Sequence, residues 1–275
     1  MPDPLLPGPL WFVGCGNMGS AMLDGWVAAG IDPAHVTVVR PTGRPVGHDV
    51  RVLTDYPEDE VPAIALLAMK PYQLDTVAPA LAPILDRGTM LVSILAGVEL
   101  ASLRARFAAP VTVLRAMPNL PVRLGKGVVN LCGEGADPTA RVMATGLMAA
   151  LGHAEWFDDE SLFALAGHLT GAGPAFLFRF IDALAAAGEA LGLPFEQAAR
   201  LALRMVEGAA ALAAASPDDP EALARRVASP GGTTEAGLKI LDDERALADL
   251  MLRTLEASRL RGAEMALAAR AAARD

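Results

Sequence analysis

The 275-residue chain has little cysteine, few aromatic residues and no excess of positive charge. Cys15 and Cys132 are its only cysteines, so the sequence offers neither a disulfide framework nor a zinc spacing, which suits a reducing cytoplasm. The net charge of −9 argues against a general nucleic-acid binder. No uninterrupted apolar run reaches the roughly 18 residues of a membrane span. We therefore predict a cytoplasmic protein with a small-molecule substrate and with no nucleic-acid, membrane or metal partner.

Apolar residues make up 53% of the sequence, but their kind differs between its two parts. Residues 10–157 contain eighteen valines, whereas residues 158–275 contain only Val206 and Val227 among many alanines and leucines. Because β-branched residues favour strands and alanine and leucine favour helices, we expect a sheet first and helices afterwards. The predicted domains are an extended proline-rich leader (1–9), a sheet domain (10–157) and a helical domain (158–275).

Short apolar runs alternate with helical patterns in the predicted sheet domain. We predict strands at 10–14, 35–39, 63–69, 89–95 and 111–117, and helices over about 16–29 and after Pro71. Strands that are apolar on both faces and separated by helices indicate a parallel sheet covered on both sides. The predicted fold class is therefore α/β, with an N-terminal Rossmann-type doubly wound parallel sheet followed by an all-helical domain.

The first predicted strand runs directly into a loop of the form G-x-G-x-x-G. A strand before this motif and a helix after it are the context in which it binds a dinucleotide, with the pyrophosphate at the helix N-terminus. The alternative is a glycine-rich turn without a ligand. The predicted cofactor-binding residues of the loop are Gly14, Cys15, Gly16, Asn17, Met18 and Gly19.

The segment after the second predicted strand, VVRPTGRPVG, should select the cofactor. A carboxylate here usually binds the ribose 2′-hydroxyl of NAD, whereas an arginine accommodates the 2′-phosphate of NADP. Arg40, Thr42 and Arg44 come first and the next carboxylate is Asp49. We therefore predict NADPH, bound by Arg40 and Thr42, with NADH as the alternative cofactor. If the arginines are only solvated loop residues, this preference does not follow.

A second glycine-rich segment, SPGGTTEAGL at 229–238, interrupts the predicted helices. Successive backbone N–H groups in such a turn can form a concave anion site, and the threonine hydroxyls add hydrogen-bonding groups. Taken alone, the segment is explained more simply as a tight turn between two helices.

Four further segments, AMKP (68–71), ILAGVEL (94–100), RAMPNLPVRLGKG (115–127) and TGAGPAF (170–176), join these two loops in one pattern. In order and spacing the series closely resembles the pyrroline-5-carboxylate reductase family, from about Leu10 onward. RAMPN and SPGGTT are specific to that family, whereas the glycine loop is not. The resemblance implies an oxidoreductase of proline biosynthesis that reduces 1-pyrroline-5-carboxylate to L-proline with NADPH. It also implies a homodimer with interlocked helical domains, or a larger oligomer of such dimers.

The resemblance further implies residue roles. Backbone N–H groups and a hydroxyl of the SPGGTT loop would hold the substrate carboxylate, and Thr234 would act as the catalytic residue by placing its hydroxyl against the ring nitrogen. The implied substrate-binding residues are Glu160, Ser229, Gly231, Gly232, Thr233 and Thr234. The remaining implied cofactor-binding residues are Ala68, Met69, Lys70, Pro71, Ala96, Gly97 and Asn119.

The chain departs from the family pattern at several positions near these segments. They are Thr170 and Ala172 in place of serines, Phe176 in place of tyrosine, Leu120 in place of threonine, and Arg226 in place of a small polar residue. Asp55 is an unusual carboxylate beside the adenosine end of an NADP site. These departures bear on the exact substrate and cofactor more than on the reaction class.

Other functions remain open on the same residues. One is the NADP-dependent reduction of a related cyclic imine. Another is a β-hydroxyacid-type dehydrogenase, which depends on a lysine in the helical domain, where Lys239 is the only one. A third is a non-catalytic nucleotide-sensing protein, against which the intact SPGGTT loop argues. No histidine is a good general acid, and we interpret His168 as structural.

Two helical segments, 177–193 and 198–215, are apolar around most of their circumference. Helices of this kind must be buried, and the predicted helical domain has little interior in which to bury them. An intimate homodimer, as the resemblance implies, would bury them.

Overall fold

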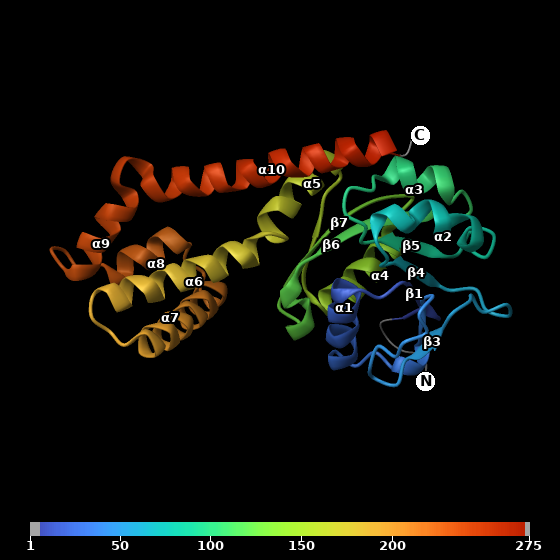
Figure 1. The fold of residues 1–275 in the computed structure, drawn as a ribbon, viewed down its shortest axis with the longest axis horizontal. Coiled ribbons are helices and arrows are strands. Elements are labelled where there is room, and N and C mark those ends of the chain that lie inside the picture. The colour runs from blue at the N-terminus through green and yellow to red at the C-terminus, as the bar shows by residue number, and fades with distance from the viewer. Residues whose placement is uncertain (1–5, 273–275) are drawn as a thin grey trace. The chain divides into compact units, whose positions relative to one another are not determined.

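The computed structural model describes residues 6–272, with side chains for residues 6–264. The chain forms two compact units. The first extends to Ala172 and resumes at Arg259, and the second comprises Gly173–Ser258. The sheet belongs entirely to the first unit (Figure 1).

The first unit is built on an eight-stranded sheet with the order β3-β2-β1-β4-β5-β6-β7-β8. Strands β1 to β6 run parallel, β7 lies antiparallel to β6, and β8 lies parallel to β7. The chain winds outward from β1 to β3 and then returns to β4 on the other side of β1, as in doubly wound dinucleotide-binding sheets. The strands are β1 (Leu10–Val13), β2 (Val36–Val39), β3 (Arg51–Leu53), β4 (Ile64–Leu67), β5 (Met90–Ser93), β6 (Thr112–Pro118), β7 (Gly127–Glu134) and β8 (Gly152–Trp156).

Helices cover both faces of the sheet, and each face has its own apolar core. Leu10 and Phe12 pack with α1 and α4, whereas Trp11 and Val13 pack with α2, α3 and α5. Successive side chains of a strand point to opposite faces, so β1 contributes to both cores. The helices are α1 (Asn17–Ala28), α2 (Leu74–Leu81), α3 (Leu100–Arg106), α4 (Pro138–Ala149) and α5 (Glu160–Thr170), with 3₁₀ turns η1 (Pro33–His35), η2 (Pro71–Gln73) and η3 (Leu120–Leu124).

The predicted fold class is confirmed, and the five predicted strands lie within two residues of their expected bounds. Strands β3, β7 and β8 were not predicted, and β7 makes the sheet mixed instead of purely parallel. The reason is the short connection between Pro118 and Gly127, which holds only η3. A parallel return would need a crossover of a dozen or more residues, so the chain turns back antiparallel.

All the regular structure of the second unit is helical. Its elements are α6 (Gly173–Ala190), α7 (Phe195–Ala215), α8 (Pro220–Val227), α9 (Thr233–Asp242), η4 (Asp243–Arg245) and the first part of α10 (Ala246–Ala272). Ala185 of α6 is buried, as are Ala198 and Ala202 of α7. Larger apolar side chains are exposed instead, including Phe178 at 59% and Leu212 at 60%.

The two compact units meet in the sequence at Ala172 and Gly173, whereas the predicted domain boundary lies at residues 157 and 158. Helix α5 groups with the sheet because Phe163 is buried in one of the sheet's cores and Glu160 pairs with Arg115 of β6. Most of the predicted leader lies outside the described residues, but Leu6 is buried in the other core.

Among the described residues, the stretch Glu160–Ala190 alone is long and apolar enough to cross a membrane. Only its length and composition indicate a membrane span, and the core helices of soluble proteins can have the same length and composition. It spans both α5 and α6 and carries Arg179, Asp182 and Glu189. The absence of a membrane partner therefore stays a prediction.

Candidate functional site: a nucleotide-binding sheet edge and a glycine-rich helix start

The glycine loop follows β1 at the carboxyl end of the parallel strands. Gly14 has a φ of +79°, and a Cβ atom there would lie 2.8 Å from the backbone of Met69. Only glycine combines this left-handed conformation with such a close approach. The Gly14 N–H also donates to the Val39 carbonyl at 2.8 Å, which joins the loop to the end of β2.

The other two glycines of the loop differ in their surroundings. A Cβ on Gly16 would meet no atom within 4 Å, whereas a Cβ on Gly19 would lie 3.3 Å from that of Ala68. Gly16 is exposed and forms the N-cap of α1, and the first turn of that helix carries no acidic residue. Open space at Gly16 and close packing at Gly19 are what a pyrophosphate at the helix N-terminus requires.

The segment after β2 lies beside this loop. Arg40 is half-buried, and its guanidinium is close enough to Cys15 to oppose the effect of burial on that thiol. Burial is the stronger effect and raises the pKa of Cys15 above its ordinary value, so the thiol stays protonated at neutral pH. Thr42 and Arg44 are exposed in the same segment. The Asp55 carboxylate accepts a hydrogen bond from the Thr54 hydroxyl at 2.9 Å, just after β3.

The predicted segments AMKP and LAG follow β4 and β5 at the same edge of the sheet. The Ala68 N–H donates to the Val13 carbonyl at 2.9 Å, so the start of AMKP lies next to the glycine loop. Ala68 is buried, whereas Ala96 and Gly97 are exposed. The structure thus gathers the glycine loop, AMKP and LAG along the carboxyl ends of three adjacent strands.

Asn119 lies at the end of β6 but is already engaged through its side chain. Its carboxamide nitrogen donates to the Thr170 carbonyl at 3.0 Å, and its oxygen accepts from the Val128 N–H at 2.9 Å. The Thr170 hydroxyl in turn accepts from the Asn130 carboxamide at 2.9 Å. Thr170, a departure from the family pattern, therefore joins the end of α5 to strands β6 and β7.

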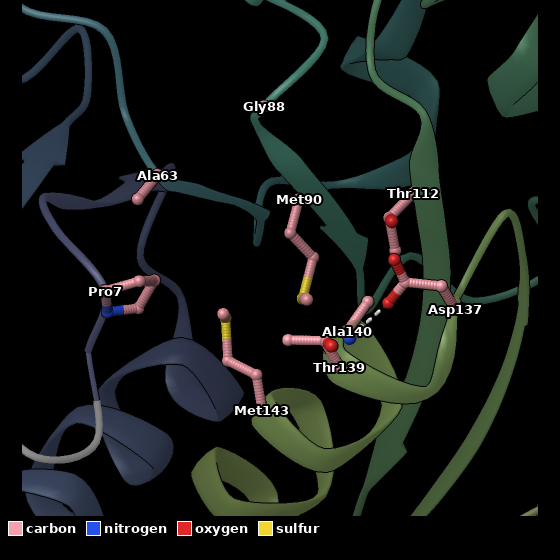
Figure 2. A pocket seen from close by; sticks show the side chains of 9 residues that line it. All are labelled: Pro7, Ala63, Gly88, Met90, Thr112, Asp137, Thr139, Ala140 and Met143. Carbon is pink, nitrogen blue, oxygen red and sulfur yellow. Dashed lines mark hydrogen bonds between the residues drawn. The ribbon is translucent and has the colours of Figure 1, made fainter.

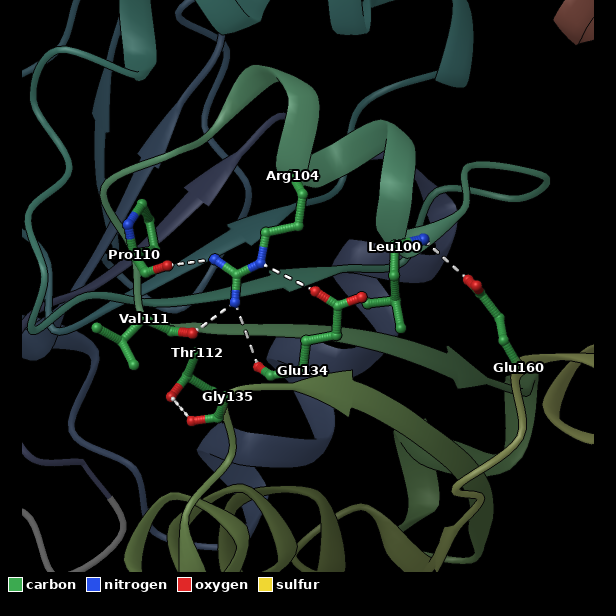
Figure 3. Close-up of polar contacts among 8 residues, drawn as sticks. All are labelled: Leu100, Arg104, Pro110, Val111, Thr112, Glu134, Gly135 and Glu160. Carbon is green, nitrogen blue, oxygen red and sulfur yellow. Dashed lines mark hydrogen bonds and ion pairs between the residues drawn. The ribbon is translucent and has the colours of Figure 1, made fainter.

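Glu160 begins α5 and contacts two other elements. Its Oε1 accepts from the Leu100 N–H at 2.9 Å, at the start of α3 (Figure 3), and from Arg115 at 2.7 Å. Arg115 was not among the predicted site residues. An arginine within the apolar run VTVLRAM was the signal available, because a buried cation requires a partner.

The SPGGTT loop of the second unit connects α8 to α9. Gly231 has a φ of +70°, and the Gly232 N–H donates to the Ser229 carbonyl at 2.9 Å, which closes a tight turn. Thr233 and Thr234 are the first two residues of α9. Neither hydroxyl has a hydrogen-bond partner within the part of the chain that the structure describes.

The N–H of Gly231 donates to the carboxylate of Glu235 at 2.6 Å. A carboxylate from the chain itself therefore occupies part of the predicted anion site. The ammonium of Lys239 lies 3.6 Å from the same side chain. Glu235 was not among the predicted site residues.

Two other residues singled out in the sequence have partners of their own. Arg226 pairs with Asp218 at 2.6 Å. The ring of His168 lies against Gly262 of α10, where a Cβ atom would come within 2.5 Å of it. Burial and the positive charge of Arg259 lower the pKa of His168 below its ordinary value.

A separate cavity of about 230 Å³ lies at the opposite ends of the strands (Figure 2). Met90 and Thr112 line it from the starts of β5 and β6, and Met143 lines it from α4. Ligands of doubly wound sheets bind at the carboxyl ends of the strands, so this cavity does not belong to the nucleotide site.

The strand order and the glycine loop together define a Rossmann-type dinucleotide-binding unit. Residues 9–97 match a family described as NADP oxidoreductase, coenzyme F420-dependent. Residues 160–265 match the pyrroline-5-carboxylate reductase dimerisation family.

Comparison of the whole chain specifies the family. The chain is 36% identical over 267 residues to the pyrroline-5-carboxylate reductase of Pseudomonas aeruginosa, covering 93% of this chain and 96% of that one. It is 31% identical to the Escherichia coli enzyme, over 90% and 96% of the two chains. The solved pyrroline-5-carboxylate reductase from Coxiella burnetii superimposes with a TM-score of 0.85 at 30% identity, over 94% and 98% of the two chains. The chain belongs to the pyrroline-5-carboxylate reductase family, and the predicted resemblance is confirmed.

Proposed function

We propose that the site residues described above carry out the reaction of the family, the NADPH-dependent reduction of 1-pyrroline-5-carboxylate to L-proline. Family membership makes the chain an oxidoreductase with a small-molecule substrate. The observation that carries the proposal is the pair of glycine-rich helix starts, at Gly16 and at Gly232, within a chain similar to these reductases over nearly its full length.

The nucleotide lies along the carboxyl edge of the sheet. Gly14–Gly19 hold its pyrophosphate, because Gly16 leaves open space in front of the N-terminus of α1. Arg40 and Thr42 bind the 2′-phosphate, which favours NADPH over NADH. Residues 68–71 and Ala96, Gly97 and Asn119 line the remainder, with Asn119 acting through its backbone because its side chain bridges β7 and α5.

The substrate carboxylate binds at the start of α9. The backbone N–H groups of residues 231–234 and the Ser229 hydroxyl supply donors, and the helix N-terminus favours a negative charge. To bind there, the substrate displaces the Glu235 carboxylate from the Gly231 N–H. Glu160 contributes on the substrate side through Oε2, because Oε1 accepts from Leu100 and Arg115.

When bound, NADPH supplies the hydride that is added to the carbon of the C=N bond, and the nitrogen carries a proton by the time the amine forms. The chain's task is to hold the imine face to face with the nicotinamide, since proximity and orientation supply much of the rate. Thr234 orients the ring by a hydrogen bond between its hydroxyl and the nitrogen. It acts by positioning and by stabilising charge, so no histidine is required.

The matched dimerisation family supports a homodimer formed through residues 160–265. The exposed apolar side chains of α6 and α7 supply the surface that such a dimer would bury. We propose further assembly of dimers into a larger oligomer, and a cytoplasmic location, where both cysteines would stay reduced.

A spectrophotometric assay tests the reaction. NADPH should be oxidised rapidly when 1-pyrroline-5-carboxylate is present, and proline should accumulate in equal amount. Oxidation of β-hydroxyacids with NADP⁺ tests the dehydrogenase alternative, for which Lys239 already pairs with Glu235. Activity on β-hydroxyacids alone, or on neither substrate, would overturn the proposed function.

A further inference from the structure

Arg115 is a buried cation held in a fixed position. Its side chain is 7% exposed, and its guanidinium forms an ion pair with Glu160 at 2.7 Å. The guanidinium carbon also lies 4.7 Å from the centre of the Phe163 ring. Both partners belong to α5, so a single β6 side chain fixes the first turn of that helix. Breaking a buried ion pair leaves an uncompensated charge, which makes this arrangement hard to change.

Glu160 extends this contact to a third element. The oxygen that pairs with Arg115 also accepts from the N–H of Leu100, the first residue of α3 (Figure 3). The first N–H groups of a helix need acceptors from outside it. The N-cap residue of α3, Glu99, provides no side-chain cap for the helix. Glu160 therefore caps α3 from a position sixty residues later in the sequence.

Leu100 lies three residues after Gly97, the last residue of the exposed Ala96–Gly97 segment. The carboxylate of Glu160 holds the start of α3, two residues (Val98 and Glu99) beyond this segment, and Arg115 holds the carboxylate. Asn119 lies four residues after Arg115 and directly follows β6, at the same edge of the sheet. One oxygen atom thus links the start of α3, strand β6 and the start of α5.

We propose that Arg115, acting through Glu160, is a positioning residue for hydride transfer. The Arg115–Glu160 pair holds the Ala96–Gly97 segment in the position in which it lines the nicotinamide site. Arg115 itself contacts neither substrate nor cofactor. This inference rests on the proposed function, in which that segment lines the cofactor. A displacement of about 1 Å between reacting groups is enough to slow an enzyme about a hundredfold.

Helix α3 also provides a matched control. Arg104 of α3 pairs with Glu134 of β7 at 3.2 Å and donates to the carbonyls of Pro110 and Val111 (Figure 3). This second arginine–glutamate pair secures the loop that precedes β6, at the other end of that strand. Replacing Glu134 by Gln perturbs α3 and β6 without touching the LAG segment.

The test compares Arg115→Met and Arg115→Lys with Glu134→Gln. We expect Arg115→Met to lower kcat about tenfold to hundredfold and to raise the primary isotope effect measured with 4-deuterated NADPH. The KM for pyrroline-5-carboxylate should change less than kcat. Hydrogen exchange in the cofactor-free protein should show faster exchange at the Leu100 amide. Arg115→Lys, which keeps the charge, should recover part of both losses, and Glu134→Gln should change neither.

Three outcomes would overturn the inference. One is an Arg115→Met variant that loses melting temperature but keeps the wild-type kcat, isotope effect and Leu100 exchange. Another is a rise in substrate KM alone, which would assign the pair to substrate binding. The third is equal kinetic damage from Glu134→Gln. Should Arg115→Met fail to fold, Arg115→Gln, which keeps a hydrogen-bond donor but removes the charge, gives the same comparison. A wild-type protein inactive on pyrroline-5-carboxylate would instead refute the proposed function, and the exchange measurement would still report on the cap.

Discussion

Trp11, Phe12 and Trp26 of the first unit are fully buried, whereas Phe178, Phe180 and Leu201 of the second unit are 47–59% exposed. The first unit therefore has an apolar core of its own on each face of its sheet. The second buries small alanines between α6 and α7 and leaves its large apolar residues outside. Exposed apolar surface on this scale marks an interaction site. The comparison teaches that the first unit covers its large apolar side chains itself, whereas the helical unit leaves its own exposed, and we infer that the dimer indicated by the matched family covers them.

The largest effect should come from the core of the first unit. Phe12→Ala removes a fully buried ring that packs edge-on against Trp26. We expect a loss of about 3–5 kcal/mol in the free energy of unfolding, because lost burial and the remaining cavity both contribute. Chemical denaturation followed by tryptophan fluorescence measures it. A loss below about 1 kcal/mol would contradict the assignment of Phe12 to a tightly packed core.

The second effect should separate association from folding. Phe178→Asp places a charge on the exposed apolar surface of α6. We expect the dissociation constant of the dimer to rise about a hundredfold, since truncating central interface aromatics typically costs at least 2 kcal/mol. Sedimentation velocity measures the dimer, and titration with NADPH checks that the first unit still binds. Replacement of Leu191, which is 90% exposed in the α6–α7 turn, serves as the control. A dimer of unchanged stability would place the interface elsewhere.

The third effect concerns the cofactor and belongs to the first unit alone. Arg40→Asp should weaken NADPH binding by tenfold to about a hundredfold, because it exchanges a charged hydrogen-bond donor for an anion. NADH binding should change much less. Fluorescence titration of both nucleotides measures the difference, with Arg44→Asp, in the same exposed segment, as the control. Equal losses for NADPH and NADH would contradict the assignment of the 2′-phosphate to Arg40.

The fourth effect is the counterpart in the second unit. Thr234→Ala should lower kcat/KM about tenfold to hundredfold, which corresponds to the roughly 1.5–3 kcal/mol of a hydrogen bond to a charged group. NADPH affinity and melting temperature should change little. Thr233→Ala, one residue earlier in α9, is the matched control. If both variants lose activity equally, the shape of the loop matters and the Thr234 hydroxyl has no role of its own.

The smallest expected effect is a gain in apparent affinity for the substrate. Glu235→Gln retains an acceptor for the Gly231 N–H but removes a negative charge from the place proposed for the substrate carboxylate. We expect the KM for pyrroline-5-carboxylate to fall about two- to fivefold, within the range of an exposed charge interaction. Steady-state kinetics with Lys239→Gln as a comparison measures it. A raised KM would show that Glu235 supports the loop instead of competing with the substrate.

The sequence predicted what depends on local pattern. Short apolar runs marked five strands, and the glycine motif marked the edge where the predicted nucleotide-binding segments gather. The three-residue strand β3 was too short to show a period, and β7 became a strand through pairing with β6. Arg115 and Glu160 lie 45 residues apart, so only the packing of α5 on the sheet reveals their pairing. Likewise, the two hydrogen bonds by which the Asn119 side chain joins β7 and α5 involve residues 9 and 51 positions away, so only the fold reveals them.

Substitutions at Gly14 and at Gly16 should have different genetic effects. A side chain at position 14 would collide with the Met69 backbone, so alleles at that codon should deplete the protein and behave as recessive losses. A side chain at position 16 meets open space, so those alleles should yield abundant, folded subunits that bind the nucleotide poorly. Such subunits still enter dimers with wild-type partners. In a cell that carries both forms, alleles at position 16 should therefore be dominant wherever the two sites of a dimer depend on each other.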